Sequence, residues 1–268
     1  MAYIDNTGPL RGYKALSFDC YGTLIEWEPN KRKALEPLIK LLPKGHDYAT
    51  DPKLALVRYT ELANEIEQSD PTRLYNLILV DSMKKLAMEL GVNESHITEA
   101  EYEAMATGPG RWPPFADTIA ALKVLKKHFK LIILSNVDNA NIQRTVSGPL
   151  GDVEWDAVYT AEDIGSYKPS PKNFEYLFRR AKDELGADVE KGELLHVARS
   201  LKVDHSAAKA LGFKSCWISR GGDTKEGQGI GGDYGQMMME GEVSFQWKFD
   251  TLGDFATEVE RQFGLAEA

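Results

Sequence analysis

The pattern that most constrains this fold is a series of short apolar runs that alternate with segments of helical periodicity. The apolar runs are Ala15–Phe18, Lys130–Leu134, Ala157–Thr160, Leu194–Ala198 and Lys214–Ile218. The helical segments are Asp117–His128, Asn139–Val146, Pro171–Leu185 and Asp204–Leu211. Buried strands that alternate with helices of this length pair in parallel, because each helix carries the chain back to start the next strand. We therefore expect an α/β fold, a doubly wound, Rossmann-like parallel sheet with helices on both faces.

One long stretch between the first and second apolar runs does not follow this alternation. From Pro29 to Leu90 the apolar residues recur at helical spacing, as Leu54, Val57, Leu62 and Ile66 do, and no strand pattern occurs. We interpret residues 26–111 as a helical cap domain inserted into an α/β core that comprises residues 1–25 and 112–268. Residues 221–241, which are rich in Gly and Met, lack periodicity and are predicted to form a surface loop, followed by a last strand within Val243–Phe249.

Composition narrows the class of protein. The chain has 268 residues and 43% hydrophobic residues, which suffices for a large core. Its net charge of −9 argues against nucleic acid or an anionic membrane as partner. The two cysteines, Cys20 and Cys216, lack the spacing of a zinc site, and no secretory signal or apolar run of roughly 20 residues is present. These features predict a cytoplasmic protein that acts on a small molecule.

Polar residues follow the predicted strands at the edge of the sheet where such folds bind ligands. These residues are Asp19 after the first strand, Ser135 and Asn136 after the second, Lys168 after the third, and Arg199, Ser200 and Asp204 after the fourth. Parallel strands end at the same edge, so a carboxylate, a hydroxyl, an ammonium and a second carboxylate should converge on one crevice. The topology alone thus predicts a reactive site there.

The same segments carry a family resemblance. The chain resembles the haloacid dehalogenase superfamily in four motifs that occur in order: FDCYGTL at Phe18–Leu24, LIILSN at Leu131–Asn136, SYKPSP at Ser166–Pro171 and HVARSLKVDHSAAKALGF at His196–Phe213. The resemblance implies that Asp19 is a covalent nucleophile, Lys168 its counter-charge and Asp204 a candidate base. Thr23, Ser135 and Asn136 would then hold oxygens of the nucleophile or the substrate.

A carboxylate nucleophile limits the chemistry to a few steps. It can attack carbon or phosphorus to give an ester intermediate, which water hydrolyses with help from a general base. A neighbouring lysine lowers the pKa of the carboxyl group and keeps it charged.

Two departures from the phosphatase motifs indicate attack at carbon. Phosphatases similar to this chain carry a second Asp where Tyr21 stands, and a Gly-Asp-Ser sequence where Ala198-Arg199-Ser200 stands. The acid that protonates a leaving alcohol is therefore missing, and a cation replaces a magnesium ligand. The resemblance then favours the 2-haloacid dehalogenase branch, which is metal-independent. It implies no cofactor and no metal, with Arg58 as a substrate-binding residue in the cap alongside Tyr21, Arg199 and Ser200.

Other differences leave alternatives open. Ser170 and Phe174 replace an Asp and a Tyr of the dehalogenase motif, and the segment before Asp204 lacks its Asn. The site could therefore open an epoxide or catalyse a rearrangement, as an isomerase of secondary metabolism would. A small-molecule phosphatase and a non-catalytic binding protein rank lower. The remaining expectations are an apolar wall from Trp27, Trp112 and Phe115, a position for His205 on a helix surface, and a homodimer through apolar cap helices.

Overall fold

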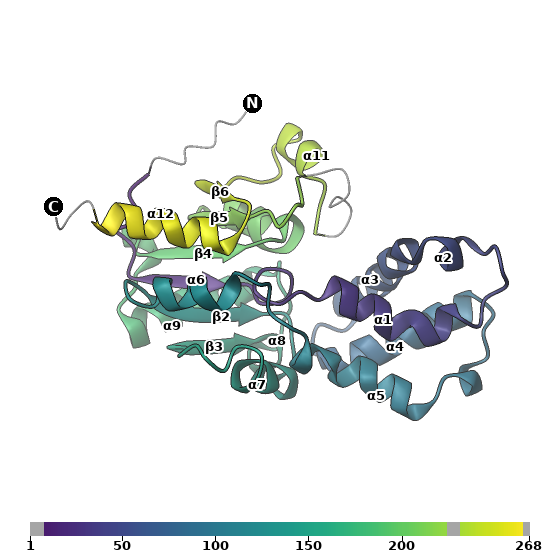
Figure 1. Ribbon diagram of the computed structural model, residues 1–268. Helices are drawn as coiled ribbons and strands as arrows, with labels where there is room; N and C mark the ends of the chain where they lie inside the picture. Colours follow the sequence, from purple (N-terminus) through teal and green to yellow (C-terminus); the bar gives the residue numbers. More distant parts are fainter. Residues whose placement is uncertain (1–7, 224–230, 265–268) are drawn as a thin grey trace.

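The computed structural model describes residues 8–223 and 231–264, which form a six-stranded parallel sheet covered by helices (Figure 1). The strands are β1 (Ala15–Phe18), β2 (Lys130–Ser135), β3 (Ala157–Thr160), β4 (Leu194–Ala198), β5 (Ser215–Ile218) and β6 (Trp247–Phe249). Their order is β3-β2-β1-β4-β5-β6, so the strand that carries the first motif lies between β2 and β4. The predicted α/β fold is confirmed, because the sheet is parallel throughout and its order reverses beside β1.

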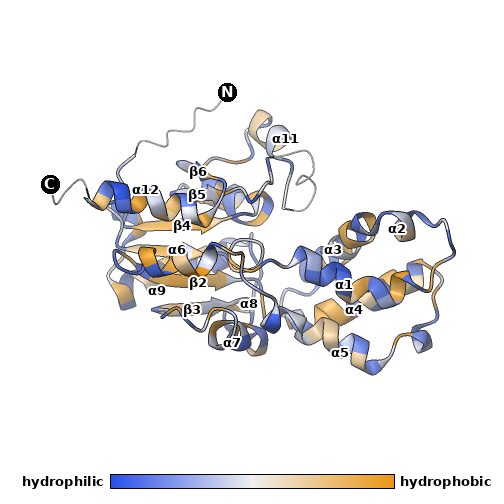
Figure 2. Ribbon diagram, viewed as in Figure 1, coloured by the Kyte–Doolittle hydropathy of each residue, from blue (hydrophilic) through white to orange (hydrophobic). Residues whose placement is uncertain are grey.

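Helices cover both faces of the sheet because side chains alternate along each strand. Leu131 and Ile133 of β2 pack on one face, whereas Ile132 and Leu134 pack on the other. The first face is covered by α6 (Thr118–Leu125), α7 (Asn139–Ser147) and α12 (Leu252–Gly264), and the second by α9 (Pro171–Leu185) and α10 (Ser206–Leu211). The inner strands β2 and β4 are hydrophobic along most of their length (Figure 2).

The chain between β1 and β2 folds into a separate group of helices beyond one end of the sheet (Figure 1). These helices are α1 (Glu28–Ile39), α2 (Asp47–Thr50), α3 (Pro52–Ser69), α4 (Tyr75–Glu89) and α5 (Glu99–Thr107), with short 3-10 turns at Glu94–His96 and Gly108–Arg111. They enclose their own apolar cluster, which includes Tyr59, Leu79 and Met83. Side-chain caps begin three of them: His46 accepts a hydrogen bond from the Tyr48 amide, Asp51 accepts one from the Lys53 amide, and Thr98 forms a capping box with Glu101.

The segment predicted as a surface loop, 221–241, is partly helical. Residues 224–230 lie outside the described residues, but α11 (Tyr234–Met239) follows them. The Asp233 side chain caps this helix, and Met237 packs in a small cluster with Trp217 and Phe245. Sequence periodicity did not reveal it because a helix of six residues spans fewer than two turns.

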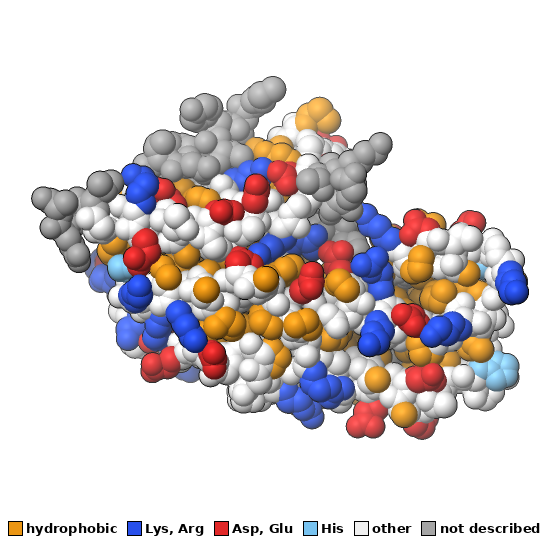
Figure 3. Space-filling model, in the orientation of Figure 1, with side chains coloured by type: hydrophobic (Ala, Val, Ile, Leu, Met, Phe, Trp, Pro, Cys, Tyr) orange, Lys and Arg blue, Asp and Glu red, His pale blue; other side chains and the backbone are white. Residues whose placement is uncertain are grey.

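Acidic and basic side chains are interspersed over core and cap on the face shown in Figure 3. No helix among the described residues is both long and apolar enough to cross a membrane. Both cysteines are buried and unpaired with each other.

Candidate active site

The expected nucleophile lies at the carboxyl end of β1. Asp19 is 8% exposed, and both of its carboxylate oxygens accept hydrogen bonds. Oδ1 lies 2.9 Å from Nζ of Lys168, and Oδ2 lies 2.8 Å from the hydroxyl of Thr23. Gly22, with φ of +100°, turns the chain between them, and a Cβ there would lie 2.9 Å from the indole nitrogen of Trp27. The carboxylate is thus held in a fixed orientation at the edge of the sheet.

Lys168 uses all three of its N–H donors in this site. Its buried ammonium donates to Asp19, to Oδ1 of Asp204 at 2.7 Å and to the carbonyl of Leu134 at 3.0 Å. The Asn136 side chain fixes the backbone of this lysine, because its amide nitrogen donates to the Lys168 carbonyl and its oxygen accepts from the Lys168 amide. Asn136 therefore positions the lysine.

Asp204 lies behind Lys168 and has no exposed surface. Its Oδ1 also lies 2.9 Å from Nε2 of His196, whose Nδ1 lies 2.9 Å from the hydroxyl of Ser17. A carboxylate only accepts, so Nε2 carries the proton in this bond. The arrangement places Asp204 where it holds the lysine, and it does not line the cavity described below.

Burial and pairing set the charges of these groups. Burial raises the pKa of the Asp19 carboxyl above its usual value, and the ammonium of Lys168 opposes this shift. Burial acts in the same direction on Asp204, but Lys168 and His196 outweigh it and hold its pKa well below the usual range. The two carboxylates likewise outweigh the burial of Lys168 and raise its pKa, so the lysine stays protonated. His196 stabilises the charge of Asp204 and does not contact Asp19, so the pKa of Asp19 lies above that of Asp204 and Asp19 is the more basic carboxylate.

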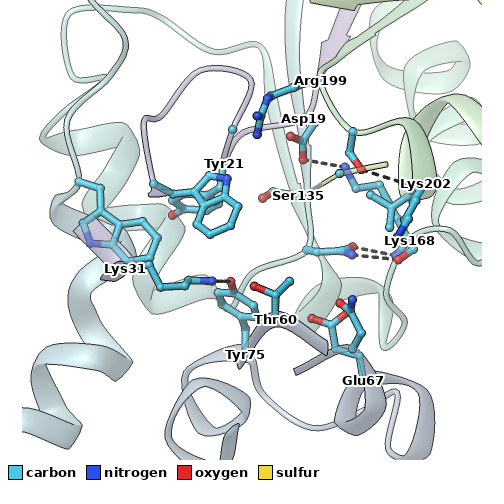
Figure 4. A pocket seen from close by; sticks show the side chains of 18 residues that line it. Asp19, Tyr21, Lys31, Thr60, Glu67, Tyr75, Ser135, Lys168, Arg199 and Lys202 are labelled. Carbon is cyan, nitrogen blue, oxygen red and sulfur yellow. Dashed lines mark hydrogen bonds and ion pairs between the residues drawn. The ribbon is translucent and has the colours of Figure 1, made fainter. Parts of the chain in front are cut away.

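A cavity of about 190 Å³ lies over Asp19, between the sheet edge and the cap (Figure 4). One wall, the core wall, comprises Asp19, Tyr21, Gly22, Ser135, Asn136, Lys168, Arg199, Ser200, Lys202, Val203 and Gly231. The other, the cap wall, comprises Trp27, Lys31, Thr60, Asn64, Glu67 and Tyr75, together with Trp112 at the junction. The structure thus brings together every residue predicted at the strand ends except Asp204.

Two predicted substrate contacts in the core wall have protein partners. Nη1 of Arg199 lies 2.7 Å from a carboxylate oxygen of Glu28, which links the core wall to helix α1. Its backbone amide donates to the hydroxyl of Thr23, the residue that also donates to Asp19. The hydroxyl of Tyr21 lies 2.8 Å from that of Thr145. Both side chains line the cavity; the hydroxyl of Tyr21 is engaged by Thr145, whereas Nε of Arg199 is buried and has no hydrogen-bond partner among the described residues.

The structure places Arg58 outside this cavity. Its guanidinium donates to Glu89 at 2.6 Å, to Glu61 at 3.0 Å and to Glu65 at 3.1 Å. The physical reason is the helical period: Thr60, Asn64 and Glu67 of α3 face the cavity, and a residue two positions before Thr60 points to the opposite side. Arg58 therefore does not have the position that substrate binding requires.

Other expectations also need correction. His205 is fully buried instead of lying on a helix surface, with hydrogen bonds to Ser215 and to the carbonyl of Ala198. Burial lowers its pKa to about 4, so it is neutral. The helix expected from Asp204 begins one turn earlier as a π-helical turn, Leu201–His205, which rotates this histidine inward. Phe115 packs under the guanidinium of Arg220 at 4.1 Å and does not line the cavity, whereas Trp27 and Trp112 do.

Sequence reasoning missed two kinds of functional candidate. His196 lies in the fourth motif, where an ionisable residue inside an apolar strand was a usable signal. The sequence did not indicate that residues of the cap wall such as Lys31 and Glu67 line a cavity. Charged residues on amphipathic helices usually face solvent.

The donor set does not fit the divalent ion that phosphatases of the superfamily use. Among residues 8–223 and 231–264, no group of three or more His, Cys, Asp or Glu side chains is arranged to hold a metal. Both oxygens of Asp19 are engaged by Lys168 and Thr23, and the guanidinium of Arg199 lies in the same wall. A further cation there would be repelled.

A parallel sheet with a lysine-paired carboxylate at its carboxyl edge and a helical cap defines a class of hydrolases. The chain belongs to the haloacid dehalogenase-like hydrolases, whose family model matches residues 13–212. It is 31% identical over 219 residues to the (S)-2-haloacid dehalogenase of Pseudomonas sp. (strain YL), covering 81% of this chain and 87% of that protein.

Two further proteins resemble the chain, one in sequence and one in fold. The chain is 26% identical over 218 residues to the 5-amino-6-(5-phospho-D-ribitylamino)uracil phosphatase YigB of Escherichia coli (strain K12), covering 78% of this chain and 85% of that one. The solved structure of the L-2-haloacid dehalogenase from Xanthobacter autotrophicus superimposes with a TM-score of 0.65 at 20% identity, covering 92% and 98% of the two chains. The second comparison shows the shared fold.

Proposed function

We propose that this protein is a metal-independent hydrolase that acts at carbon, releasing halide from a 2-haloacid through an ester with Asp19. The observation that carries this proposal is that Asp19 is held by two hydrogen bonds and that no acidic side chain stands at the position of the phosphatase acid. Asp19 is oriented by Lys168 and Thr23, and the residue at the position of the phosphatase acid is Tyr21, whose hydroxyl contacts Thr145. Halide leaves as an anion and needs no proton, so a core wall without a free acid suits it.

The reaction proceeds in two balanced steps. A carboxylate oxygen of Asp19 forms a bond to the α-carbon as the carbon–halogen bond breaks, and the halide departs with the bonding electron pair. Water then cleaves the ester, which gives the 2-hydroxyacid, restores the carboxylate and releases one proton. Lys168 stabilises Asp19 before attack and after release. Asp204 is a positioning residue in this scheme, because it contacts Lys168 and is shielded from the cavity.

The charges of the core wall support the proposal that the enzyme needs no metal. A metal would neutralise repulsion between an anionic substrate and Asp19. Here Lys168 pairs directly with the nucleophile, and Arg199 lies on the same wall. These cations supply positive charge where magnesium would otherwise bind, so activity should persist in a chelator.

A second candidate function is the opening of an epoxide or a similar strained carbon electrophile. It is favoured by Glu67, a half-buried carboxyl group of the cap wall whose pKa burial raises to about 7. A protonated carboxyl group in the cavity could donate a proton to a leaving alkoxide, which halide does not require. A phosphatase remains the third candidate, since it also needs an acid but would need a metal site in addition.

The test is halide release from 2-haloacids of both hands in EDTA, for the wild-type enzyme beside Asp19→Asn. We expect release by the wild type and a loss of about a thousandfold or more in the variant, because the amide is a poor nucleophile. Absence of release from every haloacid would overturn the dehalogenase proposal. Conversion of epoxides, lost in Glu67→Gln, would establish the second candidate instead.

A further inference from the structure

The cap wall contains a buried lysine that the proposed chemistry does not use. Lys31, on helix α1, is only 5% exposed. Its ammonium has one hydrogen bond, to the hydroxyl of Tyr75 at 3.4 Å. Among the described residues, no carboxylate lies within 4.0 Å of it, so this cation is buried without an ion-pair partner. Such burial is costly unless another group compensates the charge.

Aromatic rings supply part of that compensation. The ammonium lies 4.6 Å from the ring centre of Trp27, 5.5 Å from that of Tyr59 and 5.8 Å from that of Trp112. Cation–π contacts of this kind offset some of the lost hydration but leave ammonium N–H donors available. Burial still dominates, and it lowers the pKa of Lys31 to about 8.

The position of Lys31 relative to the nucleophile decides what it can bind. Lys31 and Asp19 line the same cavity from opposite walls, and Figure 4 shows the lysine across the cavity from the Asp19–Lys168 pair. Two cations of the core wall, Lys168 and Arg199, are paired with carboxylates, and the third, Lys202, is exposed to solvent. Because Lys31 and Asp19 lie on opposite walls, an anionic group bound at Lys31 would belong to a part of the substrate other than the reacting carbon.

We propose that Lys31 binds a second, distal carboxylate of the substrate while the reacting carbon lies against Asp19. The substrate class is then a halogenated dicarboxylic acid, with one carboxylate beside the reacting carbon and the other in the aromatic surroundings of Lys31. This inference deepens the proposed function and rests on it for the reacting group. It makes Lys31 a specificity-determining residue.

Glu67 is compatible with this role. It lies on the cap wall and influences Lys31 electrostatically, but no ion pair within 4.0 Å joins the two in the described structure. Below a pH of about 7 the Glu67 carboxyl is neutral, so it does not repel an anion at Lys31. Lys31 is protonated over the same range.

The test uses two non-reacting acids of the same chain length, glutarate and pentanoate, which differ only in the second carboxylate. Their binding to the full chain is measured by titration calorimetry at about pH 6.5. We expect the wild type to bind glutarate at least about tenfold more tightly, and Lys31→Met to bind both acids about equally, because one lost charge-assisted contact costs roughly that factor. Lys31→Arg should retain most of the preference.

Lys33→Met is the matched control, because it removes the same charge from an exposed position two residues away on α1. It should keep the glutarate preference. Circular dichroism establishes that each variant is folded, and Lys31→Gln replaces Lys31→Met if methionine is not tolerated. No preference in the wild type, or an unchanged preference in the neutral variant, overturns the inference. Neither acid is turned over, so this result is independent of whether halide is released.

Discussion

The two walls of the cavity differ in whether their charged side chains form ion pairs. On the core wall the reactive charges are paired, since Lys168 lies within 2.9 Å of both Asp19 and Asp204. On the cap wall Lys31 is buried and Glu67 is half-buried, and neither has an ion-pair partner within 4.0 Å in the described part of the chain. The charges around Asp19 in the core wall are thus paired before substrate arrives, whereas Lys31 and Glu67 of the cap wall are not paired with a charged group of the described residues.

This difference separates the roles of the two walls. A network whose members are already bonded is rigid and pre-organised, which is what a nucleophile needs. A wall with unpaired charges binds ligands of the opposite charge more tightly than neutral ligands. This difference in affinity makes the wall selective. Changes in the core wall should therefore lower kcat, whereas changes in the cap wall should raise KM or Kd for particular ligands.

The largest effect is expected from Lys168→Met. The substitution leaves Asp19 and Asp204 facing each other without a counter-charge, so one of them must take up a proton. We expect kcat for halide release to fall by about a thousandfold per folded molecule, and the free energy of unfolding to fall by about 3 kcal/mol or more. Rapid-quench kinetics and urea denaturation measure the two quantities.

Lys126→Met is the matched control for that change. Lys126 also pairs with an aspartate, Asp156, at 2.6 Å, but on the far side of the core from the cavity lining. It should lose a little stability and no activity. Equal losses of kcat in the two variants would show that pairing near Asp19 has no special role.

Most of the core wall could be predicted from the sequence. Strand ends in a parallel sheet share one edge, so apolar runs that stop at Asp19, Ser135 and Arg199 place these residues together without knowledge of packing. The contact between Asp204 and His196 was harder to predict, because it depends on a π-helical turn that periodicity does not reveal.

The cap wall could not be predicted in the same way. Which face of a cap helix meets the sheet depends on packing between helices, and a helical pattern alone leaves that rotation open. Arg58 and Lys31 are both cations on amphipathic helices, yet one lies among glutamates and the other among aromatic rings. Only the structure distinguishes them.

An intermediate effect is expected from pH on the cap wall. Lys31 loses its charge as the pH rises through about 8, and Glu67 gains a negative charge as the pH rises through about 7. Both changes weaken anion binding, so glutarate affinity should be highest below pH 7 and fall about tenfold by about pH 9, where a group of pKa 8 is roughly one-tenth protonated. The other titratable groups that face Lys31 are Glu28, Tyr59 and Tyr75.

Glu67→Gln separates the two contributions to that pH dependence. The variant should lose the part of the decline near pH 7 and keep the part near pH 8. Titration calorimetry of glutarate across the range measures both. An affinity that is flat from about pH 6 to 9 in the wild type would contradict the assignment of the anion to Lys31.

The smallest effect is expected from Arg58→Ala. The guanidinium bonds three partly exposed glutamates on the outer side of the cap, and such pairs contribute about 1 kcal/mol or less to the free energy of unfolding. We expect kcat/KM to stay within about twofold of the wild type, because Arg58 lies on the face of α3 opposite Thr60, Asn64 and Glu67. A tenfold loss of kcat/KM without loss of stability would mean that the cap turns to bring Arg58 to the substrate. Arg58 would then bind the substrate anion in a second orientation of the cap. The difference between the two walls described above would hold only for the orientation seen in this structure.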